Sequence, residues 1–234
     1  MKKTDNESSW RIVGTVSASY LAFSYAAGIA IFLVALRYTE ITDLAGRLAV
    51  VVDHPSLVFA TNLLMYVVFG PALAALALAI RNETGIPARE DAGGTVLADI
   101  AAAVGVMWAT SLVASGMIAN AAIGPAVELS ATDRAGAETY WRAVETVTTG
   151  LGNGNGEILG SAFTLLVSLA ILRGSFLPKC VALTGFVACV PGFLSVLPSL
   201  HDLSGAFGIL QLVWFVLTAV SFARARFRAR LRTS

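Results

Sequence analysis

Hydrophobic residues follow one another along the chain in six long blocks separated by short polar connections. The blocks lie near residues 12–36, 57–80, 95–121, 157–173, 180–198 and 205–223. A helix needs about 20 apolar residues to cross a hydrocarbon core of about 30 Å. Each block is continuous rather than alternating, which favours transmembrane helices over the strands of a membrane barrel. The pattern therefore predicts an all-α fold in which residues 1–234 form one integral membrane domain, a six-transmembrane-helix bundle.

The longest polar connection, from Ile123 to Gly156, has a helical pattern of its own. Tyr140, Trp141 and Val144 fall on one helical face, and charged residues such as Glu138 and Arg142 fall on the other. We predict an extra amphipathic interfacial helix between spans three and four, with its aromatic rings at headgroup depth. It is either a membrane-surface element or lid without a chemical role, or a gate over a cavity.

A glycine-rich run, Gly150 to Glu157, follows that helix and opens the fourth span. Glycine costs up to about 1 kcal/mol per residue in a helix, so the backbone is expected to turn here. Asn153 and Asn155 supply amides, and Glu157 begins the next helix, where its dipole favours a carboxylate. Two interpretations stay open: a turn followed by an N-terminal acid, or a polar mouth that binds ligand groups.

Other polar side chains in the spans lie toward the same side of the membrane as this run. Asn62 is about two turns into the second span, and Ser115 and Asn120 are in the outer part of the third. Polar groups in lipid need partners, so these side chains should face the bundle interior. They either bond from helix to helix or line a water-filled cavity. The candidate ligand-binding set is Asn62, Ser115, Asn120, Asn153, Asn155 and Glu157.

Both histidines lie in outer connections, each beside an aspartate. His54 follows Asp53, and His201 precedes Asp202. With Glu157, the residues His54, His201 and Asp202 are candidates for a divalent transition-metal site. The alternative is that both histidines are solvated loop residues, and no other cofactor is expected.

Small residues recur at every fourth position in the third span. Ala101, Gly105 and Ala109 form one such stripe, which allows neighbouring helices to approach closely. We therefore expect this span to pack centrally in the bundle.

Basic residues indicate the orientation of the chain. With the N-terminus inside, twelve of the 16 basic residues fall on the cytoplasmic side: Lys2, Lys3, Arg11, Arg81, Arg89, Arg173, Lys179, Arg224, Arg226, Arg228, Arg230 and Arg232. The sequence predicts a multi-pass protein of the bacterial inner membrane with both termini cytoplasmic. The five C-terminal arginines are expected to attract anionic lipids in the bilayer.

Composition excludes several classes of protein. Charged residues make up 13% of the chain, against about 25% in soluble domains. A net charge of +1 argues against a nucleic-acid partner. No span contains a lysine for retinal or a histidine for haem, and no Walker, Gly-x-Ser-x-Gly or His-Glu-x-x-His motif occurs.

The C-terminal half resembles a known family. The stretch Gly154-Asn-Gly-Glu157-Ile-Leu-Gly160 precedes a span, then Leu172-Arg-Gly-Ser-Phe-Leu-Pro178-Lys, then a helix with Gly185 and Pro191-Gly192. This order is similar to the bacterial membrane proteins of domain of unknown function 4386, over about the last 80 residues. The resemblance implies a small polytopic membrane protein and supplies neither a catalytic residue nor a ligand.

Three functional hypotheses follow. The first is a protein, not expected to be an enzyme, that binds or transports a small molecule or ion through an outward-facing polar cavity. The second is a metal-dependent membrane hydrolase that acts on lipid at the outer leaflet, with the histidines, Asp202 and Glu157 as ligands or base. The third is a non-catalytic regulatory membrane subunit. The oligomeric state is left open.

Overall fold

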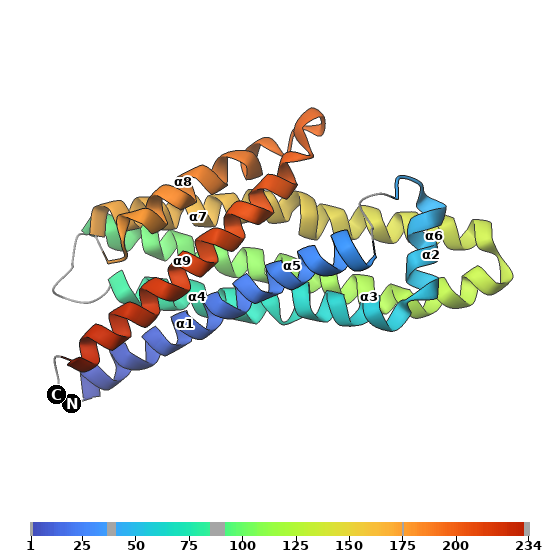
Figure 1. The fold of residues 1–234 in the computed structure, drawn as a ribbon. Helices are drawn as coiled ribbons and strands as arrows, with labels where there is room; N and C mark the ends of the chain where they lie inside the picture. The colour runs from blue at the N-terminus through green and yellow to red at the C-terminus, as the bar shows by residue number, and fades with distance from the viewer. Residues whose placement is uncertain (1, 37–40, 85–91, 175, 232–234) are drawn as a thin grey trace.

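The fold is all-α, as predicted. The computed structural model describes residues 2–36, 41–84, 92–174 and 176–231, and it describes no side chains at 2–6, 33–35, 92–93, 153–155 and 230. Within these ranges every regular element is a helix (Figure 1). In chain order they are α1 (Lys2–Ile29), η1 (Ala30–Ala35), α2 (Leu44–Asp53), α3 (Pro55–Asn62), η3 (Leu63–Val67), α4 (Phe69–Thr84), α5 (Ala92–Thr132), α6 (Arg134–Thr148), η5 (Thr149–Gly154), α7 (Asn155–Gly174), α8 (Lys179–Leu194), η6 (Pro198–Leu200) and α9 (Leu203–Leu231).

Five stretches of helix among the described residues are long and apolar enough to cross a membrane. They are Glu7–Phe32, Pro55–Thr84, Gly94–Thr132, Arg134–Gly174 and Leu203–Ala229. The fifth predicted block, 180–198, forms α8, an apolar helix of 16 residues that is shorter than these five stretches. The chain is therefore built as a polytopic membrane protein.

Six helices form a closed ring around an apolar centre. Going round the ring, α1 packs on α4, α4 on α5, α5 on α7, α7 on α8, α8 on α9, and α9 again on α1. Large side chains fill the centre, among them Trp108, Phe163, Trp214 and Phe215, each at most 2% exposed. The close approach expected of the third span is confirmed, because a Cβ on Gly70 of α4 would lie 2.8 Å from the Ala109 backbone oxygen of α5.

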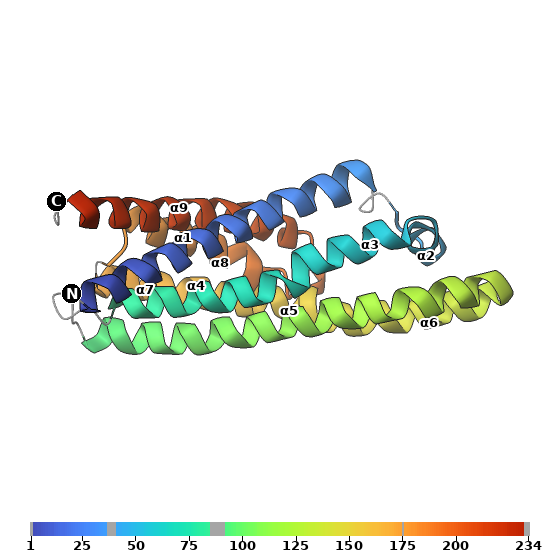
Figure 2. The ribbon, with the colours of Figure 1, turned by 90° about the horizontal axis from the view of Figure 1, so that it is seen from below.

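One helical hairpin reaches well past the rest of the ring (Figures 1 and 2). Its first arm is α5, whose 41 residues span about 60 Å, twice the thickness of a hydrocarbon core. Its second arm is α6, which continues through η5 into α7. Beyond the ring, α2 lies across the hairpin, and a second apolar core joins the three helices at Leu48, Val51, Ala122, Ile123, Ala126, Ala137 and Trp141. We call α2, α6 and the segment 122–132 of α5 the distal cap.

The predicted amphipathic segment is helical, but the structure does not confirm an interfacial position for it. The helix α6 begins at an Asp133 N-cap that accepts a hydrogen bond from Gly136 N at 2.9 Å. It then runs antiparallel to the end of α5 and packs against it (Figure 2). Its apolar face is covered by α5 and α2, because buried Ala137 and Trp141 belong to the core of the distal cap.

The turn expected at Gly150 to Glu157 is wrong. Thr149–Gly154 is π-helical and α7 follows at Asn155 without a break. An unpaired backbone group costs several kcal/mol in an apolar medium, more than the helix penalty of each glycine. The glycine-rich segment η5 also packs against α5, and this contact stabilises its helical backbone.

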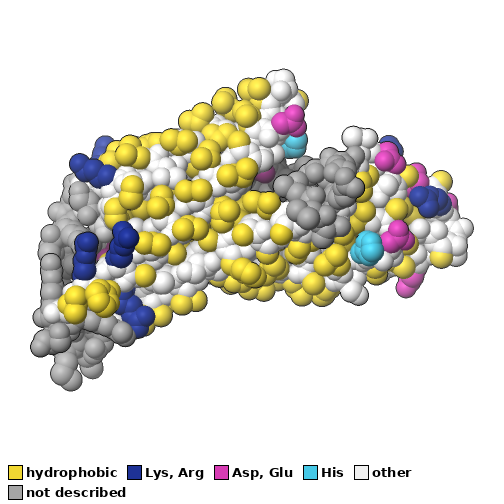
Figure 3. Space-filling model, viewed as in Figure 1, with side chains coloured by type: hydrophobic (Ala, Val, Ile, Leu, Met, Phe, Trp, Pro, Cys, Tyr) yellow, Lys and Arg dark blue, Asp and Glu magenta, His cyan; other side chains and the backbone are white. Residues whose placement is uncertain are grey.

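Charge separates along the long axis of the molecule. Figure 3 shows most of the visible Lys and Arg side chains at the end where both termini lie, and both His and most Asp and Glu side chains toward the other end, where a few basic side chains lie among them. Exposed apolar side chains, such as Leu183, Val187 and Val190 of α8 and Ile209 of α9, cover the ring between them. This surface is typical of a protein that is solvated by lipid around its middle.

Candidate functional site

Two cavities lie where the ring meets the distal cap. The first, which we call the bundle cavity, has a volume of about 140 Å³, and its lining includes Tyr25, Tyr66, Phe69, Trp108, Glu157 and Phe207. The second, the cap cavity, has a volume of about 180 Å³, and its lining includes Arg47, Asn62, Tyr66, Ser115, Trp141 and Glu145. Tyr66 lines both and therefore stands between them.

All three π-helical segments of the described chain border these cavities. Phe32 of η1, Tyr66 of η3 and Thr149 of η5 line the cap cavity, and η3 and η5 also contribute Met65 and Gly152 to the bundle cavity. A π-helical turn is wider than an α-helical turn, and such turns are typical of functional sites. The irregular backbone is thus concentrated around the two cavities.

Hydroxyl groups from neighbouring helices bond to carbonyl groups of the π-helical segments or, at Thr148, to the last carbonyl of α6 before η5. Leu64 O accepts from Tyr20 Oη at 2.8 Å and from Ser24 Oγ at 3.1 Å. Ser115 Oγ of α5 donates to Thr148 O at 2.9 Å, and Ser111 Oγ donates to Leu151 O. These bonds hold the π-helical segments η3 and η5 against α1 and α5.

Glu157 gives the bundle cavity its charge. It lies in the first turn of α7 and is the one charged side chain among the cavity's described lining residues. Its Oε2 atom is buried and has no hydrogen-bond partner within the described part of the chain. Buried polar atoms in proteins are almost always bonded, so one without a protein partner indicates a place for water, an ion or a ligand.

A second unpaired polar atom belongs to the same cavity. Trp108 Nε1 is buried and, among the described residues, nothing accepts its hydrogen. A Cβ on Gly156 would lie 3.6 Å from this nitrogen, which places the indole N–H beside the backbone next to Glu157. The cavity therefore presents one carboxylate oxygen and one N–H donor whose hydrogen-bonding capacity is unused.

Aromatic rings form a continuous wall of the bundle cavity. Tyr25 meets Phe69 edge to face with ring centroids 5.6 Å apart, and Phe69 meets Trp108 in the same way at 6.2 Å. Phe69 and Trp108 are almost fully buried. Such interlocked rings fix the shape of the wall.

In the cap cavity the two charged side chains pair with each other, although Arg47 Nε has no hydrogen-bond partner among the described residues. Arg47 Nη1 lies 3.3 Å from Glu145 Oε2, and Trp141 Nε1 donates to Glu145 Oε1 at 3.2 Å. Asn62 Nδ2 donates to Asn120 Oδ1 at 3.0 Å, and Asn120 Nδ2 donates to Phe59 O at 3.4 Å. Most of its polar groups therefore connect helices to one another.

The structure distributes the predicted ligand-binding residues between two places. Asn62 and Ser115 line the cap cavity, where they bond from helix to helix together with Asn120. Glu157 lies in the bundle cavity, and the side chains of Asn153 and Asn155 lie outside the described residues. The described members of the candidate set therefore lie on two sides of Tyr66, and both open alternatives occur: helix-to-helix bonds at Asn62 and Ser115, and a cavity at Glu157.

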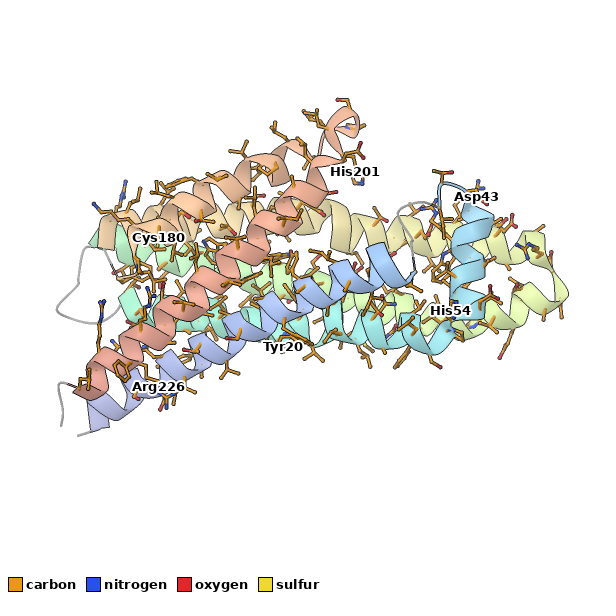
Figure 4. All side chains as sticks on the ribbon, viewed as in Figure 1. Tyr20, Asp43, His54, Cys180, His201 and Arg226 are labelled. Atoms are coloured by element: carbon orange, nitrogen blue, oxygen red, sulfur yellow. The ribbon has the colours of Figure 1, made fainter. Side chains whose placement is uncertain are left out.

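The two histidines are not brought together. His54 lies between α2 and α3, and His201 lies in the turn before α9, well separated from it in Figure 4. His54, His201 and Asp202 are all exposed, whereas Glu157 faces the bundle cavity. No three His, Cys, Asp or Glu side chains in the described ranges lie close enough to hold a metal ion. A shared metal site at these residues has no geometric support.

Sequence reasoning overlooked the aromatic and indole groups of the site. Tyr25, Tyr66 and Trp108 are amphipathic side chains in the interior of predicted spans, where a buried O–H or N–H needs a partner. Their position inside predicted spans could therefore have marked them as candidate lining residues. The pairing of Arg47 with Glu145 could not be predicted from the sequence. The two residues are far apart along the chain and come together only through the packing of α2 on α6.

Comparison with known proteins adds no assignment. No protein-family model matches the chain, and neither a curated protein nor a solved structure matches it. The likeness to domain of unknown function 4386 stays a prediction, and function is inferred from the chemistry of the cavities.

Proposed function

We propose that the protein is a six-span inner-membrane protein that binds a small molecule or ion in the bundle cavity. The helix α8 is the fifth span in chain order and brings the number to six: its 16 residues cover about 24 Å, and a short span is accommodated by local thinning of the bilayer. The position of both termini at one end of the molecule supports this number, because an even number of crossings returns the chain to its starting side.

The separation of basic and acidic side chains along the molecule supports an orientation of the protein in the membrane. Lys and Arg at the end with the termini belong in the cytoplasm by the positive-inside rule. The distal cap then lies on the outer side, with the cap cavity beneath it. Solute enters from that side and passes Tyr66, which lines both cavities.

One observation carries the proposal. The Glu157 carboxylate has a buried oxygen without a partner among the described residues, and it faces a cavity of about 140 Å³. An unpaired buried charge costs several kcal/mol. A bound solute that supplies the missing interaction offsets that cost.

Cysteine labelling tests access to this cavity. Ser204 lines the bundle cavity at the start of α9. In a Cys180→Ala, Cys189→Ala background, we expect Ser204→Cys to react with a small, charged, membrane-impermeant thiosulfonate that is applied from the outer side. Ser199→Cys, in the exposed turn before α9, is the positive control, and Ser168→Cys, fully buried in α7, is the matched negative control.

The proposal fails if Ser204→Cys stays unlabelled while Ser199→Cys reacts. It also fails if Ser199→Cys reacts only from the cytoplasmic side, because the cavity would then open to the wrong compartment.

A further inference from the structure

We propose that the bundle cavity recognises a small alkylammonium compound with a hydrogen-bond acceptor close to its cationic centre. This inference rests on the proposed function and names the class of its ligand. Charge, aromatic lining, volume and hydrogen-bonding capacity each contribute to it.

The charge of the cavity selects a cation. Glu157 is the one charged group among the described lining residues, and its Oε2 atom is buried without a partner there. An anion in this cavity would be repelled by the carboxylate, and a neutral solute would leave it uncompensated. A cation close to Glu157 compensates the negative charge of the carboxylate.

The aromatic lining selects an organic cation over a metal ion. Five rings line the cavity: Tyr25, Tyr66, Phe69, Trp108 and Phe207. Ring faces attract alkylammonium groups by cation–π interactions, and such cages are the usual receptors for quaternary ammonium ligands. Calcium, in contrast, takes six or more oxygen ligands, whereas Glu157 is the one carboxylate among the described lining residues of this cavity.

The volume favours a small ligand. The cavity of about 140 Å³ is close to the roughly 150 Å³ of a cavity that accommodates benzene. A compound of the size of tetramethylammonium or choline fits this space, and a sugar or nucleotide does not.

The Trp108 indole adds a requirement for an acceptor. Its N–H is buried and finds no acceptor among the described residues, and it lies beside Gly156, next to Glu157. A ligand that places its ammonium group near Glu157 and an oxygen near Gly156 would neutralise the carboxylate and accept the hydrogen of the indole N–H. Choline has this combination, and tetramethylammonium has only the cation.

The test compares matched ligands on the whole protein in nanodiscs of phosphatidylglycerol, a lipid without an ammonium group. Calorimetric titration should show binding of choline and tetramethylammonium. Dimethylbutanol, the uncharged isostere of choline in which carbon replaces nitrogen, should bind at least about tenfold more weakly, the factor for a loss of about 1.4 kcal/mol. Empty nanodiscs correct for attraction of cations to the lipid. This comparison needs no variant and therefore does not depend on the folding of one.

Two substitutions separate the two contacts. Glu157→Gln should weaken the binding of both cations by about 10- to 100-fold, because it removes the negative charge that attracts a quaternary ammonium group, which has no N–H to donate. Trp108→Phe keeps a ring and removes the N–H. It should therefore lower the affinity for choline by about fivefold and change the affinity for tetramethylammonium by no more than about twofold. Glu128→Gln, at an exposed position on α5, is the matched control and should change neither affinity.

The ammonium group has two sources, a free solute or the headgroup of a lipid. In nanodiscs of phosphatidylcholine, a headgroup ligand would already fill the cavity, so added choline would no longer bind. A free solute would bind equally in both lipids. Either result supports recognition of the ammonium group and identifies its source.

Failure of this inference is distinguishable from failure of the proposed function. If neither cation binds to folded protein in phosphatidylglycerol, or if dimethylbutanol binds as tightly as choline, the ligand class is wrong. If Ser204→Cys is still labelled from outside in that case, the solute-binding cavity survives with another ligand.

Discussion

Arg11 of α1 and Glu83 of α4 form a side-on ion pair inside the bundle. Arg11 Nε lies 2.7 Å from Glu83 Oε1, and Nη2 lies 3.4 Å from Oε2. The two side chains are 10% and 1% exposed. The pair joins two neighbouring helices of the ring near the end that carries the termini.

Removing one member of this pair should destabilise the protein strongly. We expect Arg11→Ala or Glu83→Ala to lower the free energy of unfolding by about 3–5 kcal/mol, because the remaining charge stays buried without its main partner. Replacing both residues by leucine should cost less than either single change. Unfolding in mixed micelles measures these differences.

The pair Arg81–Asp99 is the matched control, because it has a similar distance of 2.6 Å but side chains that are 55% and 46% exposed. Asp99→Ala should cost no more than about 1 kcal/mol. Equal losses at Glu83 and Asp99 would show that burial does not decide the contribution of these pairs.

The contact between α4 and α5 depends on the absence of a side chain at Gly70. A Cβ there would lie 2.4 Å from Val113 Cγ2 and 2.8 Å from the Ala109 backbone oxygen. Gly70→Ala should therefore destabilise the protein by about 1–3 kcal/mol, the range for an overpacked core. Val113→Ala should not restore the loss, because the contact with the Ala109 backbone remains.

Gly124→Ala on α5 is the control for this substitution. A Cβ at that position meets no described atom within 4 Å, so the same change should stabilise the helix by about 0.5–1 kcal/mol. A loss at Gly124 as large as that at Gly70 would contradict the steric argument.

Two hydroxyls share the carbonyl of Leu64 in the π-helical segment η3. Because either Tyr20 or Ser24 alone still donates to it, Tyr20→Phe and Ser24→Ala should each cost less than about 1 kcal/mol. The double variant should cost more than the sum, by at least about 0.5 kcal/mol in a double-mutant cycle. Additive losses would mean that the two bonds do not substitute for each other.

The distal cap should unfold separately from the ring, since it has its own apolar core. Trp141 is 5% exposed in that core, and Trp141→Ala should cost about 3–5 kcal/mol locally. Hydrogen exchange should then speed up in α2 and α6 and stay slow in α8 and α9. Arg142→Ala, at the exposed neighbouring position, is the control and should change neither the stability nor the exchange rates. If Trp141→Ala sped up exchange in all helices, the distal cap and the ring would form one cooperative unit.

The features that sequence predicted well are local ones. The apolar blocks correspond to helices because the length and hydrophobicity of a span belong to the segment itself. The stripe at Gly105 and Ala109 marked the face of α5 on which α4 packs, since small residues permit the approach whatever the partner is.

Pairings between distant residues were beyond the sequence. Arg11 was placed among the cytoplasmic charges, but its partner lies 72 positions away and is chosen by the packing of α1 on α4. At the site, Glu157 and Asn62 were assigned to one vestibule because both are polar and lie in the outer half. Which cavity each faces depends on the rotation of its helix, which a single sequence does not determine.

The unequal length of the helices has a mechanical consequence. The helix α5 runs as one rod of about 60 Å from the end that carries the termini to the tip of the distal cap, passing both cavities on its way. A tilt of about 5° around its inner end would displace that tip by about 5 Å. Because α5 is so long, a small change in its tilt within the ring would produce a larger displacement of the distal cap.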